Sequence, residues 1–283
     1  MTTSNQEKVL QYFKGKASGY DLVEGQVYWR LSDQLLWHLF NGSTLSKLNE
    51  SFHFLDAGGG TGRWSEKVLR SYDGSTGVIY DLSADMLEQA GKKRQNDLES
   101  RLELRQGNIE IMSDLDDGTF DLTFSFHNVL GFVNSPQEAL KEMARVTKDR
   151  GYVVSVVPSQ YHCIFFNLML GRVEEAAYAT EECKGRFTLD MPYMHLFTPS
   201  NLRELYQKAG LDDVSVFGFP VTIYPGMQET QITGSTGKIA NLLENSDNYK
   251  NIYKLEQLLS SKGEVAARGN NLFVIGMKME EQK

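Results

Sequence analysis

The chain has 283 residues, of which 41% are hydrophobic and 23% are charged, and its formal net charge is −8. These values describe a globular protein with a full core, and the acidic balance disfavours a nucleic-acid enzyme, which normally carries a basic face. No apolar run approaches the roughly 20 residues that cross a bilayer, and the first residues hold no apolar export segment, so we expect a cytoplasmic protein that contacts no membrane.

Residues 1–50 are amphipathic and aromatic, and they precede the first predicted strand. Apolar side chains recur there at helical spacing, as in Leu31, Leu35, Leu36 and Leu39. We expect two or three helices that form an N-terminal cap.

The next segment, FHFLDAGGGTG at 52–62, is the most informative in the chain. It predicts a short buried strand and a glycine-rich turn, followed by a helix that begins near Arg63. In such a turn the backbone can lie directly against a ligand. The following strand ends at Asp81, 21 residues beyond Gly60, where a carboxylate can accept hydrogen bonds from a ribose. The segment therefore predicts a site for a nucleotide-like cofactor.

The glycine spacing indicates which cofactor is excluded. A dinucleotide fingerprint G-x-G-x-x-G that begins at Gly58 requires glycine at position 63, where the chain has Arg63. The segment reads D-x-G-x-G-x-G instead, with Asp56 in front. A nucleotide-binding oxidoreductase is therefore the least favoured class.

Strands and helices alternate as far as residue 158. The predicted strands are residues 52–57, 78–81, 102–105, 120–126 and 152–157. Their near-continuous apolarity predicts a parallel sheet buried on both faces. A helix follows Asn134, with Ser135 as its cap, Pro136 at its first position and Glu138 completing a capping box.

The segment between Gln160 and Phe197 breaks this alternation. Its apolar and aromatic side chains either line an acceptor pocket as a lid or bury a helix against the sheet. Its two cysteines, Cys163 and Cys183, are expected to be reduced thiols. Beyond it, Thr198 and Gly210 bracket a helix.

The remaining chain predicts two further elements. A stretch rich in Pro, Gly, Gln and Thr follows Phe219 and leads to a helix near 252–259. The sequence NLFVIGMKM at 271–279 predicts a final strand.

Four ordered motifs resemble those of the class I S-adenosylmethionine-dependent methyltransferases, in the subgroup that includes ubiquinone-type and many natural-product enzymes. They are the glycine turn led by Asp56, YDLSADML at 80–87, GNIE at 107–110, and the whole of 120–158.

This resemblance implies an α/β fold, a Rossmann-like doubly wound sheet of seven strands in the order 3-2-1-4-5-7-6 with the last strand antiparallel. The chain is then a single methyltransferase domain over residues 1–283. Its parts are a helical N-terminal cap at 1–50, a cofactor-binding core at 51–158, a lid or acceptor insertion at 159–198, and C-terminal strands with a helical insertion at 199–283.

The resemblance also implies a set of residues that bind S-adenosyl-L-methionine. Asp81 would hold both ribose hydroxyls, and Leu82 would pack on the adenine. Asn108 would lie near the adenine amino group, where the family usually has Asp. Tyr20 would close over the methionine carboxylate. Arg30 could pair with that carboxylate, or it could be a solvated arginine on a helix surface. The full set is Tyr20, Arg30, Asp56, Gly58, Gly60, Gly62, Asp81, Leu82, Met86, Asn108, Ile109 and His127.

Three residues are candidates for a general base, and no metal site is expected. His127 ends the fourth predicted strand, where open α/β sheets place ligands, although a histidine bonded to the backbone explains it equally well. His195 and Tyr193 become candidates if the 160–197 segment is a lid. A base is needed for a phenol or alcohol acceptor and is not needed for a carboxylate, because methyl transfer mainly requires alignment.

The expected function is methyl transfer to a small-molecule or peptide-derived acceptor, on oxygen, nitrogen or carbon. A protein- or RNA-modifying methyltransferase is the alternative. It is disfavoured by the acidic charge and by FHNV at 126–129, which stands where amino-group enzymes carry an N/D-P-P-Y motif. The oligomeric state stays open.

Overall fold

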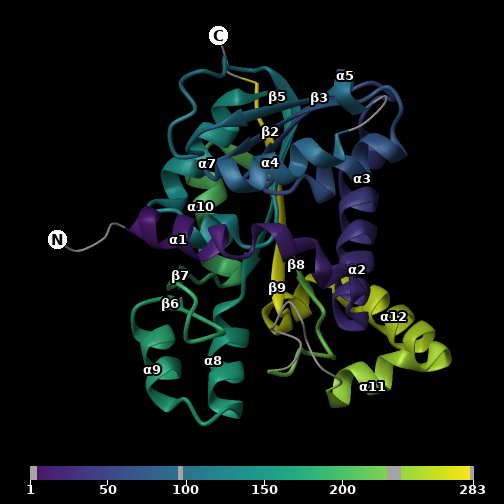
Figure 1. The fold of residues 1–283 in the computed structure, drawn as a ribbon, viewed down its shortest axis with the longest axis vertical. Coiled ribbons are helices and arrows are strands. Elements are labelled where there is room, and N and C mark those ends of the chain that lie inside the picture. Colours follow the sequence, from purple (N-terminus) through teal and green to yellow (C-terminus); the bar gives the residue numbers. More distant parts are fainter. Residues whose placement is uncertain (1–4, 95–97, 228–236, 281–283) are drawn as a thin grey trace.

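The computed structural model describes residues 5–94, 98–227 and 237–280, and its centre is a seven-stranded sheet (Figure 1). The strand order is β3-β2-β1-β4-β5-β9-β8. The strands are β1 His53–Ala57, β2 Thr76–Asp81, β3 Leu102–Gln106, β4 Phe120–Ser125, β5 Thr147–Pro158, β8 Leu211–Phe219 and β9 Asn271–Lys278. Only β9 runs antiparallel to its neighbours β5 and β8. The predicted fold class and strand order are confirmed.

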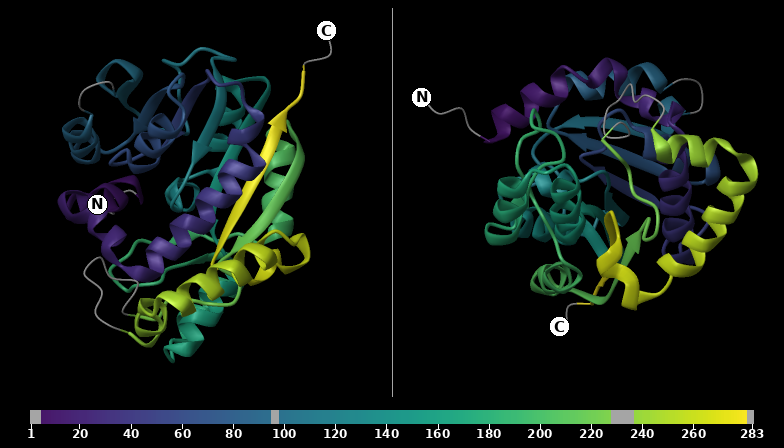
Figure 2. Two further views of the ribbon diagram at one scale, coloured as in Figure 1. Left: turned by 90° about the vertical axis from the view of Figure 1, so that its right-hand side faces the viewer. Right: turned by 90° about the horizontal axis from the view of Figure 1, so that it is seen from below.

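Helices cover both faces of the sheet (Figure 2). One face packs against α2 Val27–Ser43, α3 Arg63–Ser71 and α4 Ala84–Lys93, and the other against α7 Pro136–Val146 and α10 Pro199–Lys208. The shorter helices there are η2 Leu45–Lys47, α5 Leu98–Arg101 and α6 Val129–Phe132. Within the described ranges, no helix combines the length and apolarity that a membrane span requires.

The N-terminal helices are α1 Asn5–Lys14 and η1 Ala17–Gly25, which precede α2. They match the two or three helices expected there. Helix α1 lies beside α4, at the end of the sheet where β1, β2 and β4 finish (Figure 2). The first elements of the chain therefore cover the C-terminal edge of the parallel strands, where an open α/β sheet binds its ligand.

The irregular segment after β5 folds into α8 Gln160–Met169, α9 Val173–Glu181 and a two-stranded ribbon of β6 Lys184–Gly185 and β7 Met194–His195. It has a small core of its own around Cys163, Ala179 and Leu196. Cys163 is buried, Cys183 is exposed, and both are free thiols.

The C-terminal helices are α11 Lys238–Glu244, α12 Ser246–Ser260 and η4 Gly263–Arg268. The helix expected near 252–259 is thus the second half of the longer α12. Part of the stretch rich in Gly, Gln and Thr before it lies outside the described residues.

The capping box predicted at Ser135 forms only one of its two hydrogen bonds. The Ser135 hydroxyl accepts the Glu138 N–H at 3.3 Å, as expected of a helix cap. The Glu138 carboxylate pairs with Lys141 instead of returning to Ser135, whose N–H donates to Glu110 Oε1 at 2.7 Å. A residue brought from another loop therefore completes this cap, which local sequence cannot reveal.

Candidate functional site

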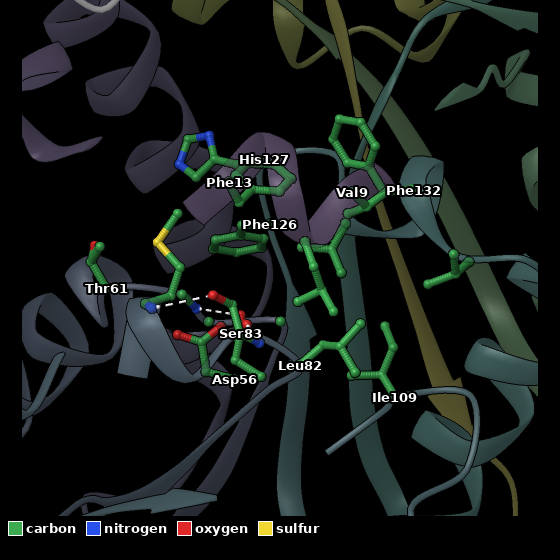
Figure 3. Close-up of a pocket in the computed structure, with 18 of the residues that line it drawn as sticks. Val9, Phe13, Asp56, Thr61, Leu82, Ser83, Ile109, Phe126, His127 and Phe132 are labelled. Carbon is green, nitrogen blue, oxygen red and sulfur yellow. Dashed lines mark hydrogen bonds between the residues drawn. The ribbon is translucent and has the colours of Figure 1, made fainter. Parts of the chain in front are cut away.

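A cavity lies at the C-terminal ends of β1, β2 and β4, with α1 on its far side (Figure 3). It brings together most of the residues that the sequence nominated for the cofactor. Those that line it are Tyr20, Asp56, Gly58, Gly60, Asp81, Leu82, Met86, Asn108, Ile109 and His127.

The glycines of the turn serve different purposes. Gly60 has a φ of +55°, and a Cβ there would meet no atom closer than Asp81 Oδ2 at 4.0 Å, so its backbone faces open space. At Gly58 a Cβ would lie 2.4 Å from Val129, so this glycine lets α6 approach β1. Gly62 is the N-cap residue of α3, lies beside Ile79 and does not line the cavity. Only part of the glycine pattern is therefore available to a ligand.

Asp81 ends β2 and points its carboxylate at the turn. Its Oδ2 accepts the N–H of Gly60 and its Oδ1 accepts the N–H of Ser83, each at 2.8 Å. Burial raises the pKa of Asp81, and the two N–H donors oppose that rise. The helix cap at this point is Ser83, which accepts the Met86 N–H. Asp81 thus does not cap the helix, and its carboxylate lies on the cavity wall.

Asp56 lies deeper, at the end of β1. It is 2% exposed, and its Oδ2 accepts the Ser65 hydroxyl at 2.7 Å. Burial raises the pKa of Asp56 to about 7, the Ser65 bond opposes this rise, and the nearby charge of Asp81 adds to it. The floor of the cavity is therefore a carboxyl that changes charge near neutral pH.

The cavity has an apolar side and an amide at its rim. Leu82 and Ile109 follow the ends of β2 and β3 and lie near one another in the cavity, which Met86 of α4 also lines (Figure 3). The Asn108 Oδ1 accepts the Glu110 N–H at 3.0 Å, which orients the amide. Together the three apolar side chains and this amide line the cavity along with Asp81.

The N-terminal helices close the opposite side. Val9, Leu10 and Phe13 of α1 line the cavity, together with Tyr20 of η1. No side chain of α1 is fully buried. The next turn is anchored by Asp21, which accepts the Thr61 hydroxyl at 2.7 Å and also pairs with Lys93 of α4. This anchor holds the cap against the glycine turn.

A charged and aromatic cluster occupies the end of β4. His127 Nε2 lies 2.8 Å from Arg63 Nη2 and 2.5 Å from Trp64 Nε1. Arg63 Nη1 pairs with Asp33 of α2 and lies 3.5 Å from Glu24 Oε1. Burial and the charge of Arg63 hold the pKa of His127 well below its usual range. His127 is therefore neutral at physiological pH.

Three predicted residues lie elsewhere. Arg30 is exposed on α2 and does not line the cavity. Tyr193 is 36% exposed, and its hydroxyl donates to Glu175 Oε1 at 3.2 Å within the 160–197 segment. His195 lies on β7 against the backbone of Val133, behind the cavity wall. The structure shows no residue of α8, α9 or the ribbon lining this cavity, so the lid expected at 160–197 stays a prediction.

The sequence reading missed the residues that replace them. Arg63 is the first residue of the helix after the glycine turn, so its position in the sequence could have marked it, instead of Arg30, as the arginine of the cavity. The apolar residues of α1 carried a helical pattern but no motif, and their place over the turn depends on the tertiary fold.

Comparison with known proteins finds a methyltransferase domain and methyltransferase relatives. A family model described as "Methyltransferase domain" matches residues 55–155. The chain is 28% identical over 226 residues to the demethylmenaquinone methyltransferase of Lactococcus lactis subsp. lactis, which covers 74% of this chain and 84% of that protein.

Two solved structures show the same fold. Phosphoethanolamine N-methyltransferase 2 of Haemonchus contortus, in complex with S-adenosyl-L-methionine, has a TM-score of 0.61 at 15% identity, over 99% of this chain and 61% of that one. The cyclase SpnF has a TM-score of 0.63 at 16% identity, over 98% of both chains. The two solved structures show the fold alone, whereas the family model and the relative, taken with the ordered motifs and the strand order, support a class I S-adenosylmethionine-dependent methyltransferase.

Proposed function

We propose that this methyltransferase acts on a small, neutral aromatic acceptor, for which a quinol is the first candidate, in the cavity beside α1. The observation that carries the proposal is an aromatic wall next to the glycine turn. Phe13 of α1 meets Phe132 of α6 edge to face, with ring centroids 5.3 Å apart, and Phe126 lines the same cavity. Such a wall suits a flat apolar ring.

The residues around the turn suit the methyl donor. The donor supplies a methyl group activated by a sulfonium. Asp81 lines the cavity and would accept the ribose hydroxyls, and the apolar side chains of Leu82, Met86 and Ile109 suit the adenine. The open backbone at Gly60 lets the donor approach the turn closely. We assign these contacts to the donor, and the aromatic wall is then left for the acceptor.

Three further observations support a small acceptor in the cytoplasm. The net charge of −8 is unsuited to a polynucleotide. Two free thiols, one of them exposed, suit a reducing compartment. The Lactococcus lactis relative is named for demethylmenaquinone, a quinone, which is the reason for choosing a quinol. The atom that receives the methyl group is then the ring carbon beside a hydroxyl, or the hydroxyl oxygen itself.

A different reaction on the same fold is the second candidate, because SpnF is a cyclase with a TM-score of 0.63 to this chain. A fold hosts several chemistries, so the reaction has to be measured on the site itself.

The first test is calorimetric titration with S-adenosyl-L-methionine, its demethylated product and NAD. We expect saturable binding of the first two and none of NAD. Asp81→Asn should weaken donor binding by roughly 2 kcal/mol, because an amide accepts fewer hydrogen bonds than a carboxylate. Asp73→Asn is the matched control, since Asp73 is exposed and outside the cavity. Equal losses in the two variants would remove the assignment of Asp81.

The second test is transfer of a labelled methyl group to a short-chain 2-prenyl-1,4-naphthoquinol under anaerobic reduction. A labelled quinol supports the proposal. Donor binding without transfer to this quinol, to a phenol or to an amine would favour a reaction other than methyl transfer.

A further inference from the structure

His127 is held in an unusual backbone conformation at the end of β4. Its φ is 53° and that of Asn128 is 70°, a region that residues other than glycine rarely adopt. The Asn128 N–H donates to Val156 O at 3.0 Å, and its carbonyl accepts the Gly131 N–H at 2.8 Å. Bonds to β5 and α6 thus fix this turn, which sets the direction of the His127 side chain. Strained turns of this kind are typical of functional sites.

The contacts of His127 determine where its proton lies. Nε2 faces the Arg63 guanidinium and the Trp64 indole N–H, and each of these groups can only donate a hydrogen bond. Nε2 must therefore carry its lone pair toward them. In a neutral imidazole the single proton then lies on Nδ1.

The two donors are themselves held in place. Arg63 is tied to Asp33 and lies close to Glu24, while Lys67 lies over the ring of Trp64, 5.1 Å from its centroid. Trp64 is 5% exposed and meets Phe126 edge to face at 5.3 Å. Neither donor can turn away from Nε2 without breaking these contacts, so the tautomer is fixed.

Nδ1 is the nitrogen that remains for a ligand. Among the described residues, the hydrogen bonds of the His127 ring all involve Nε2. Nδ1 is not a fully buried atom, so it is accessible to a ligand. His127 lines the cavity beside the aromatic wall (Figure 3). A base would need the lone pair that Arg63 and Trp64 already occupy. The prediction of His127 as a general base is therefore unsupported by its geometry.

We propose that His127 presents its Nδ1–H as a fixed hydrogen-bond donor to an oxygen of the acceptor, and that Arg63 and Trp64 are the positioning residues that hold this tautomer. The inference deepens the proposed function and rests on it for the acceptor. It limits the acceptor to molecules that offer a hydroxyl or carbonyl oxygen beside the methylated atom, and it disfavours an ammonium.

The charges around His127 favour a neutral oxygen over a carboxylate. The positive charges of Arg63 and Lys67 are balanced by the negative charges of Asp33 and Glu24, which act on the same cluster. The cluster therefore offers a directed N–H with little net charge. A quinol hydroxyl suits this environment better than the donor's own carboxylate, which would add an unbalanced charge.

The tautomer is tested directly by nitrogen NMR of the chain labelled at its five histidines, with His127→Asn to assign the signal. We expect a protonated Nδ1 and a bare Nε2 throughout a range of about pH 6 to 8. A proton on Nε2, or titration in this range, overturns the proposal. Trp64→Phe should raise the His127 pKa, because Nε2 then loses one of its two donors. This measurement needs neither donor nor acceptor, so it is independent of the proposed function.

The ligand is tested with 1-naphthol as the probe and naphthalene as the matched control without oxygen. In the presence of S-adenosylhomocysteine, 1-naphthol should shift the Nδ1 proton signal downfield, and naphthalene should not. A shift of this size with S-adenosylhomocysteine alone would place the oxygen on the donor's carboxylate and overturn the assignment to the acceptor. No shift with 1-naphthol would overturn it as well.

Kinetics with the naphthoquinol compare two substitutions. Asn tolerates a positive φ and places an amide N–H where Nδ1 stands, whereas Leu has no donor. We expect His127→Leu to lower kcat/KM about tenfold or more, and His127→Asn to retain activity within about threefold, with similar affinity for S-adenosylhomocysteine. Equal losses in two folded variants would overturn the donor role.

Discussion

At the scale of single residues, the protonation of Asp56 links the cavity floor to stability. Burial raises its folded-state pKa to about 7, whereas an aspartate in an unfolded chain ionises near pH 3.9. Between about pH 4 and 7 the unfolded chain releases this proton and the folded chain keeps it. The unfolded state then binds fewer protons, so stability falls as the pH rises through this window.

Asp56→Asn should therefore be more stable than the natural chain above pH 7, by up to roughly 4 kcal/mol, with no such advantage near pH 4. The amide oxygen can still accept the Ser65 hydroxyl, so the substitution removes the cost of ionisation and keeps the bond. Urea unfolding at the two pH values measures the difference. A variant that is less stable than the natural chain at pH 8 would contradict the sign of this effect.

Individual site residues could be predicted where a motif fixes them. Asp56, Gly60 and Asp81 lie where their spacing placed them, because the turn and strand ends that position them are local structures. The arginine could not be predicted in this way, since Arg30 and Arg63 lie on different helices and only packing decides that Arg63 lines the cavity and Arg30 does not. The tautomer of His127 likewise depends on contacts across the fold.

Among the elements, one buried carboxylate of α12 binds the segment that follows β8. Glu256 is 0% exposed and accepts the N–H groups of Val221, Thr222 and Ile223 at 2.7, 2.8 and 3.1 Å. The Thr222 hydroxyl donates to it as well. No motif in the sequence marks this residue, whose role arises from the packing of two distant segments.

Glu256→Gln should lower the free energy of unfolding by roughly 2 to 4 kcal/mol, because the amide turns one acceptor into a donor that faces other donors. Glu264→Gln, at an exposed position of η4, is the matched control. Urea unfolding should show a lower midpoint with an unchanged slope. Similar midpoints for the two variants would show that the bonds to Glu256 contribute little.

The cap of α1 and η1 is the element that should respond to the donor. It covers the cavity through apolar side chains and is anchored by the bond from Thr61 to Asp21. Hydrogen exchange in residues 5–25 should slow when S-adenosylhomocysteine is added, while α8 and α9 stay unchanged because they do not line the cavity. Thr61→Val should weaken the response. Equal protection of both regions would restore the broader lid that the sequence suggested.

The 160–197 segment shows the limit of prediction at this scale. Its aromatic and Met residues allowed either an acceptor lid or a packed helix, and the structure has two helices and a ribbon with a separate core. Composition alone cannot decide between a side chain that lines a cavity and one that packs on a neighbour.

At the scale of the whole molecule, the first and last thirds of the chain are packed together. The Asn270 amide donates to the Tyr28 hydroxyl of α2 at 3.1 Å, and the Tyr249 hydroxyl of α12 donates to Gln34 at 3.0 Å. The strand order was predictable because it follows from the resemblance, whereas these contacts were not, since each joins segments more than two hundred residues apart.

A double-mutant cycle with Tyr28→Phe and Asn270→Ala should show a coupling free energy of about 1 kcal/mol, the usual worth of a buried neutral hydrogen bond. Unfolding should be one transition when followed by tryptophan fluorescence, which reports on α2 and α3, and by circular dichroism. Zero coupling together with two separate transitions would mean that the two thirds fold independently.

The antiparallel strand β9 has a consequence for how the protein is made. β8 is an edge strand whose neighbour in the sheet is β9, and β9 comes later in the chain, after α11, α12 and η4. While the ribosome is still translating those helices, β8 has no strand to pair with, and the far edge of β5 is also open. Unpaired edges of this kind recruit other chains. A nascent chain stalled in α12 would therefore expose two unpaired strand edges, those of β8 and β5. A premature stop before Asn271 should yield an aggregate rather than a smaller folded enzyme.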